Sequence, residues 1–256
     1  MNQALRNHII KLLDKGLRLD GRKPMEYRKV SVQYNISRSA EGSSRVEIGD
    51  TVILTGVKME TMEPYPDTPE EGSLMVGAEL SPIANTEFEL GPPSSYAIEV
   101  GRVVDRGIRE SHAIDMNKLC IRAGELAWVV MIDICPLNDD GNLFDAAALS
   151  AIAAIKSAKM PGLKDDKVDY DNKTENPIPL NNIPVSVTVC KIGNYFIVDP
   201  SLEEEKVVDA RLTVATTEDN TLCALQKGGD MPLTAEDIDV MCGIAVDKCN
   251  ELRKAL

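Results

Sequence analysis

Three groups of charged residues in this sequence have types and spacings that could do chemistry. The first is a turn, PLNDDGNLFD, which leads into an Ala-rich segment and carries Asp139, Asp140 and Asp145 around Gly141. A helix that begins after a glycine turn is a natural anion seat, because its first backbone N–H groups are unpaired. Residues 137–145 contain no Lys, Arg, Ser or Thr, however, and their uncompensated carboxylates would repel a phosphate. The residues alone therefore predict a capped structural helix.

The second group is the acidic segment DPSLEEE at residues 199–205. Several neighbouring carboxylates could hold Mg²⁺, which prefers oxygen ligands. A charge run of this kind is more typical of a solvated turn between two strands, and that is the interpretation we favour.

The third group is a set of arginines on a helix expected over residues 95–111: Arg102, Arg106 and Arg109. Arg102 and Arg106 are four residues apart, so their guanidinium groups share one helix face and could grip consecutive phosphates. Surface ion pairing is the alternative, with partners among Glu99, Asp105 and Glu110.

Histidine and cysteine offer little for a metal site. The chain has two histidines, His8 and His112, and six scattered cysteines without a C-x-x-C pair. This pattern argues against zinc binding and favours buried reduced thiols in the cytosol. We expect no metal and no cofactor, and we interpret His112 as a polar residue near a helix end.

Hydrophobic periodicity predicts the elements that position these groups. An amphipathic N-terminal helix ends near Gly16, and a β-meander follows with a turn at EGSS, residues 41–44. Further apolar segments predict strands over 30–37, 45–49, 51–59, 73–84 and 128–137, and helices over 95–111 and from residue 143. After residue 184 the pattern starts again, with four short strands and a final helix that Thr234 caps.

The polar, Pro- and Asn-rich segment between these halves reads as a long linker loop. The predicted organisation is an N-terminal segment at 1–30, a first subdomain at 31–163, a linker at 164–184 and a second subdomain at 185–256. Strands followed by a helix in each half indicate an α+β fold with mixed sheets and packed helices.

Composition limits the function further. The net charge is −13 over 256 residues, which argues against tight, autonomous binding of nucleic acid. No apolar run is long enough for a membrane span, and the N-terminus lacks the features of a signal peptide, so we expect a cytoplasmic protein.

Several motifs together resemble the RNase PH-like family. The segment RLDGRKPMEYRKVSV at residues 18–32 resembles the opening of that family, R-x-D-G-R-x-x-x-E-x-R, carried by Arg18, Asp20, Gly21, Arg22, Glu26 and Arg28. The segments AEGSSRVEIGDTVILTGV, DGNLFDAAALSAIAAI and VTVCKIGNYFIVDPSLEEE resemble later parts. The likeness extends from about residue 10 to 255 and is closest to the non-catalytic RNase PH-like subunit of the archaeal exosome.

The resemblance implies two pseudo-symmetric β-α subdomains and a phosphorolytic chemistry. Inorganic phosphate attacks the 3′-terminal linkage of RNA, and nucleoside diphosphates are released. Active members of the family hold the phosphate with a Gly-Thr/Ser-Arg turn and carry two aspartates six residues apart in the second half.

This chain departs from the pattern of active members at each of these places. The phosphate turn reads Gly141-Asn142-Leu143, and Glu205 and Arg211 stand at the two acid positions. Family arginines are replaced as well, by Ser95, Tyr96 and Glu60. Phosphate attack on a phosphodiester needs positive charge to gather two anions, so these losses predict a chain without catalytic residues.

The resemblance implies binding in place of catalysis. In the family, the helix at 95–111 faces the active site of the neighbouring subunit, which favours RNA contact by Arg102 and Arg106 and, more weakly, by Arg109. We expect a ring of three heterodimers with the catalytic subunit, with RNA-binding cap proteins on one face and single-stranded RNA as the ligand. Two alternative functions remain: an autonomous phosphate-dependent exoribonuclease that uses Glu205, and a scaffold that never touches RNA.

Overall fold

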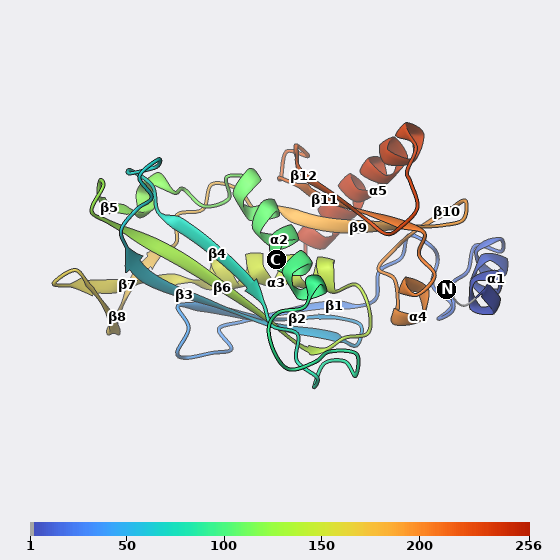
Figure 1. Ribbon diagram of the computed structural model, residues 1–256, viewed down its shortest axis with the longest axis horizontal. Helices are drawn as coiled ribbons and strands as arrows, with labels where there is room; N and C mark the ends of the chain where they lie inside the picture. Colours follow the sequence, from blue (N-terminus) through green and yellow to red (C-terminus); the bar gives the residue numbers. More distant parts are fainter. Residues whose placement is uncertain (1–2) are drawn as a thin grey trace.

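A computed structural model describes residues 3–256, apart from the side chains of residues 171–173. Residues 1–2 of the predicted N-terminal segment lie outside this description. Two β-sheets enclose a central helical layer, and a further helix covers the outer face of the smaller sheet (Figure 1). The architecture is α+β with mixed sheets and packed helices, as the sequence predicted.

The larger sheet has six strands in the order β1-β2-β3-β6-β4, and β5 pairs with β6. Neighbouring strands are antiparallel except β4, which runs parallel to β6. Its strands are β1 (Val30–Tyr34), β2 (Gly42–Ile48), β3 (Thr51–Met62), β4 (Ser73–Ala78), β5 (Cys120–Arg122) and β6 (Leu126–Asn138). The buried positions of β3 alternate, so one side faces the core.

The smaller sheet is antiparallel, in the order β10-β9-β11-β12. Its strands are β9 (Val185–Ile192), β10 (Tyr195–Val198), β11 (Ala210–Thr216) and β12 (Leu222–Gly228). The C-terminal helix α5 (Ala235–Arg253) packs on β9 and β11. It begins with a capping box in which Thr234 and Asp237 bond each other's backbone N–H groups, as predicted.

Helix α3 (Leu143–Ser157) is the central element of the fold, packed against β2 and β3 on one side and β9 on the other. It is buried from Leu143 to Ile155. Alanine supplies a small side chain and the best helix propensity, so the Ala-rich sequence lets both sheets approach the helix closely. The approach is tightest at Gly42 of β2, where a Cβ atom would lie 2.4 Å from the carbonyl oxygen of Ala154.

Helix α2 (Ser95–Glu110) lies beside α3 and contacts β4 and β12. The hydroxyl of Ser94 caps it by accepting a hydrogen bond from the backbone N–H of Ala97 at 3.2 Å. Apolar residues face the core and arginines face outward, the amphipathic arrangement expected of a surface helix. Three shorter helices complete the chain: α1 (Gln3–Leu13), the 3₁₀ turn η1 (Asn117–Leu119) and α4 (Leu202–Glu205).

The prediction of an irregular linker loop at 164–184 is wrong for much of that segment. Strands β7 (Lys159–Lys164) and β8 (Lys167–Pro177) form an antiparallel hairpin. Its two-residue turn places Asp165 and Asp166 at φ of +51° and +62°, the left-handed conformation that tight hairpin turns require. The hairpin has little apolar alternation because most of its residues are exposed or half-exposed.

Two smaller expectations in the first half are also corrected. The predicted turn EGSS is largely strand, because β2 begins at Gly42 and pairs with β3 from that residue. The short strand β5 was not predicted, since three residues are too few for a periodic signal.

The close approach at Gly42 gives a stability test. A Gly42→Ala substitution would push a methyl group into the backbone of α3, which cannot move aside as a flexible side chain would. We expect the free energy of unfolding to fall by roughly 2–3 kcal/mol, as measured by urea denaturation. Gly56→Ala is the matched control in the adjacent strand, where the nearest atom to a new Cβ lies 4.0 Å away. Equal losses in the two variants would contradict this account of the packing.

Candidate functional site

The glycine turn before α3 is tightly built into the surrounding structure. Gly141 has φ of +89°, and a Cβ atom on it would lie 2.5 Å from the carbonyl oxygen of Pro200. Thr51 of β3 stabilises the turn through two hydrogen bonds. Its hydroxyl donates to the carbonyl of Gly141 at 2.7 Å and accepts from the backbone N–H of Asp140 at 3.1 Å. Only glycine combines this backbone conformation with so close a neighbour.

The anion seat at the start of α3 is filled by carboxylates of the chain itself. The backbone N–H of Asn142 donates to Glu205 at 2.8 Å, and that of Gly141 donates to Asp139 at 3.0 Å. Leu143, the third residue of the turn, is buried in the core and offers neither a hydroxyl nor a guanidinium group. An incoming phosphate would therefore meet two carboxylates where a phosphate site presents free donors.

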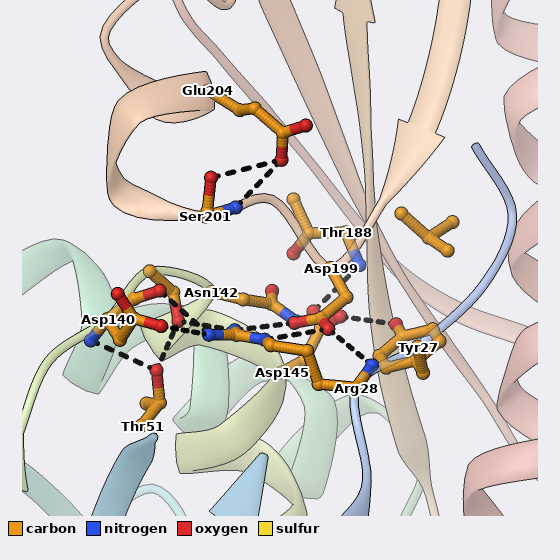
Figure 2. Close-up of polar contacts among 12 residues, drawn as sticks. Tyr27, Arg28, Thr51, Asp140, Asn142, Asp145, Thr188, Asp199, Ser201 and Glu204 are labelled. Atoms are coloured by element: carbon orange, nitrogen blue, oxygen red, sulfur yellow. Dashed lines mark hydrogen bonds and ion pairs between the residues drawn. The ribbon is translucent and has the colours of Figure 1, made fainter. Parts of the chain in front are cut away.

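The expectation that the carboxylates of this turn are uncompensated is wrong. Arg28 reaches across from the N-terminal segment to pair with Asp140 at 3.0 Å, and it also donates to the carbonyls of Asp140 and Gly141 (Figure 2). Asp145 is fully buried, where it accepts hydrogen bonds from the hydroxyl of Tyr27 at 2.5 Å and the backbone N–H of Thr188 at 2.7 Å. Burial raises the pKa of Asp145 to about 7.

Asp199 forms the centre of this polar network. It is completely buried, has φ of +49°, and accepts hydrogen bonds from Arg28 at 2.7–2.9 Å, from Arg22 at 2.8 Å and from the amide of Asn142 at 2.9 Å. Burial opposes its ionisation, but the hydrogen bonds and positive charge of Arg28, together with Arg22, hold the pKa of Asp199 below its ordinary value.

Glu204 forms a second buried ion pair beside Asp199. Its carboxylate contacts Arg18, which is 2% exposed and also donates to the carbonyls of Val198 and Asp199, each at 2.7 Å. The carboxylate also accepts a hydrogen bond from the backbone N–H of Ser201. The interpretation of residues 199–205 as a solvated turn is therefore wrong, and arginines hold two of the carboxylates that the Mg²⁺ alternative needed.

Glu205, Arg211 and Tyr96 face a cavity of about 470 Å³ beside the glycine turn. The ring of Tyr96 packs edge-on to that of Phe144 at 5.6 Å, and the guanidinium of Arg211 lies over Phe144 at 4.5 Å. Burial raises the pKa of Glu205 to about 7, and nearby Asp139 adds to the rise. The structure thus brings together, along one cavity, four of the positions at which the resemblance implies a departure from active members: Tyr96, Asn142, Glu205 and Arg211.

The other three positions, Leu143, Glu60 and Ser95, do not line the cavity. Glu60 is exposed near the end of β3 and does not line the cavity. Ser95 lies at the start of α2 and lines a neighbouring groove between α2 and β12, about 350 Å³ in volume.

The groove between α2 and β12 contains two of the three candidate arginines. Arg102 and Arg106 are exposed, and neither forms an ion pair with any residue that the structure describes. Arg106 makes one long contact to Gln226, at 3.4 Å. Arg109 differs, because its guanidinium contacts Asp105 at 2.7 Å and donates to the carbonyl of Leu74. The surface ion pairing considered for all three therefore holds for Arg109 only.

The described part of the chain contains no group of three or more His, Cys, Asp and Glu residues placed to hold a metal ion. None of its helices is long and apolar enough to cross a bilayer. The residues that sequence reasoning missed are Arg18, Arg22 and Arg28, which form the ion pairs of the acidic segment. The opening motif at residues 18–32 contains these three arginines, but it does not indicate the distant carboxylates with which they pair.

The half-buried carboxyl of Glu205 predicts a pH-dependent stability. Its pKa rises from 4.5 to about 7 on folding, so the stabilisation from its protonated form is complete below about pH 4.5 and is lost as the pH rises to about 7. Glu205→Gln removes this titration and keeps an oxygen for the N–H of Asn142. We expect the variant to exceed the parent in unfolding free energy by up to roughly 3 kcal/mol at pH 8 and by little at pH 4.5, measured by urea denaturation.

Glu203→Gln is the matched control, because this exposed carboxylate lies on the same short helix. A Glu205→Gln variant whose stability relative to the parent does not change with pH would contradict the assignment.

Comparison with known proteins agrees with this geometry. The description "3' exoribonuclease family" applies to two models that match the chain, domain 1 over residues 26–161 and domain 2 over residues 182–248. The exosome complex component Rrp42 of Methanocella arvoryzae is 45% identical over 251 residues, an alignment that covers 98% of this chain and 95% of that protein.

Solved structures give the same result. A chain of an Archaeoglobus fulgidus exosome with RNA bound to the active site superposes with a TM-score of 0.91 at 44% identity, covering 98% of this chain and 97% of the other. A chain of an archaeal exosome core gives a TM-score of 0.87 at 40% identity, covering 98% and 96%. The resemblance that the sequence motifs indicated is confirmed, and the chain belongs to the 3′ exoribonuclease family, with the RNase PH-like fold.

Proposed function

We propose that this chain is a non-catalytic subunit of an exosome, which forms a ring with a catalytic RNase PH-like subunit and contributes to RNA binding. The observation that carries the proposal is the occupied anion seat: Glu205 and Asp139 accept the backbone N–H groups of the glycine turn. Near-full-length similarity to exosome components named Rrp42, and to chains of archaeal exosome structures, supports the assembly.

The charge around the cavity argues against phosphorolysis by this chain. The reaction brings inorganic phosphate to a phosphodiester, and its transition state must be stabilised by nearby positive charge. Of the cationic side chains that line the cavity, Arg211 is paired with Glu99 at 2.6 Å and Lys206 with Glu203 at 2.6 Å. Three acidic side chains, Glu87, Asp139 and Glu205, and two cations that are already paired do not form a site for two anions.

The proposal extends to the arrangement of the assembly, the subdomains of this chain and its location in the cell. The assembly would be a trimer of heterodimers with RNA-binding cap proteins on one face, and residues 31–163 and 185–256 would form its two subdomains in this chain. All six cysteines are free, which supports a reducing, cytoplasmic location.

RNA contact is assigned to the groove between α2 and β12. Arg102 and Arg106 lie on one face of α2 with free guanidinium groups, and Arg106 reaches towards Gln226 on β12. Free guanidinium groups bind phosphate oxygens strongly, whereas Arg109 is already neutralised by Asp105. We therefore assign the main phosphate contacts to Arg102 and Arg106 and a minor share to Arg109.

An RNA decay assay in inorganic phosphate tests the catalytic assignment. We expect no nucleoside diphosphate release from this chain alone, because its anion seat is filled. Its mixture with a catalytic RNase PH-like relative should degrade RNA faster than the relative alone. Release of nucleoside diphosphates by the pure chain would establish the rival function, an autonomous exoribonuclease.

Neutralising the groove tests the RNA contact. In the assembled ring, Arg102→Gln/Arg106→Gln should weaken single-stranded RNA binding roughly tenfold. The slope of log Kd against log salt should fall by about 0.7 for each RNA phosphate that the variant no longer neutralises. Lys118→Gln/Arg122→Gln is the control: it removes two exposed positive charges from η1 and β5, at the far edge of the larger sheet (Figure 1). An affinity and salt slope equal to those of the parent would instead support a scaffold that does not touch RNA.

A further inference from the structure

Arg211 makes its contacts in two directions. One face of its guanidinium lies over the ring of Phe144 in the cavity, with the centroid 4.5 Å away. Its Nη2 atom reaches the carboxylate of Glu99 on α2 at 2.6 Å. The side chain that stands at a family acid position is thus linked to the helix that carries the RNA-contacting arginines.

Glu99 is a potential obstacle to RNA in the groove. Glu99, Arg102 and Arg106 are spaced three and four residues apart on α2, so they share one helix face, and all three line the groove. An unpaired carboxylate beside two phosphate-binding guanidinium groups would repel the RNA backbone and compete for both arginines. Neither arginine forms an ion pair with Glu99, however, and that carboxylate is paired with Arg211 of β11 instead.

The position of Arg211 is fixed by more than the ion pair. Arg211 lies opposite Gly228 in the pairing of β11 with β12, and a Cβ atom on Gly228 would lie 2.4 Å from the guanidinium carbon of Arg211. The guanidinium therefore occupies space beside the bare glycine, where it lies over the ring of Phe144 and pairs with Glu99. This confinement reduces the entropy lost when the pair forms.

We propose that Arg211 is a positioning residue for the RNA groove: it neutralises Glu99 and keeps Arg102 and Arg106 free for phosphate. The inference rests on the proposed RNA contact. With Arg211 in place, the groove has two uncompensated positive charges. Without it, Glu99 cancels one of them. Arg211, which stands where the resemblance places the family's second acid, therefore also supports binding of the RNA backbone.

A rescue experiment in the assembled ring tests this role, with single-stranded RNA affinity and its salt slope as readouts. Arg211→Met keeps apolar bulk over Phe144 and removes the charge. We expect it to weaken RNA binding roughly threefold to tenfold, the scale of one charge acting on a neighbouring phosphate. Glu99→Gln alone should match or exceed the parent, and Arg211→Met/Glu99→Gln should return to within about twofold of it.

The outcomes separate this inference from the proposed function. If Arg102→Gln/Arg106→Gln weakens RNA binding but Arg211→Met does not, the positioning role of Arg211 is wrong. The assignment of RNA contact to the groove is then retained. A loss in Arg211→Met that Glu99→Gln fails to rescue marks a merely structural role, which also overturns the inference. If neutralising Arg102 and Arg106 has no effect, the groove assignment fails and the role of Arg211 fails with it.

A second variant covers the case in which Arg211→Met does not assemble. Gly228→Ala adds a methyl group where the guanidinium now lies and should displace it from Glu99 without removing its charge. We expect a smaller loss of RNA affinity, again restored by Glu99→Gln. Unchanged affinity in Gly228→Ala would count against the role.

Discussion

The buried carboxylate of Asp199 is the interaction on which the site depends. Three separate parts of the chain meet there: Arg22 and Arg28 from the N-terminal segment, Asn142 from the start of α3, and Asp199 itself from the end of β10. A buried charge is tolerated only with such partners, since removing water from it is costly. The network therefore fixes the N-terminal segment against the smaller sheet and sets the position of the glycine turn.

This network also explains how the chain itself stabilises the glycine turn before α3. Arg28 is the cation nearest the turn, and it is held by Asp140 and Asp199. Glu205 accepts the N–H of Asn142 and so completes the helix start from within the chain. The unpaired donors of a helix N-terminus need some acceptor, and here the side chain of Glu205 supplies it.

The ion pair of Arg211 with Glu99 links the cavity to the proposed RNA groove. Arg211 lines the cavity beside the glycine turn, yet its partner Glu99 lines the proposed RNA groove. Arg102 and Arg106 remain free on the outer face of α2, whereas Arg109, one turn further along, is neutralised by Asp105. An acidic chain can in this way present a local positive groove, because most of its arginines are paired and a few are not.

The sequence alone determined the family, the α+β class, the position of most helices and strands, and the absence of a hydroxyl or guanidinium group at residues 141–143. These features are local: they follow from hydrophobic periodicity, capping residues such as Thr234, and motifs read along the chain. Tertiary structure alone decided which charges meet. Arg18 pairs with Glu204, Arg28 with Asp199 and Arg211 with Glu99 across more than 100 residues each, so no local pattern predicts them. The acidic segment resembles a solvated turn for that reason, since burial of a carboxylate depends on a distant partner that only the folded chain brings to it.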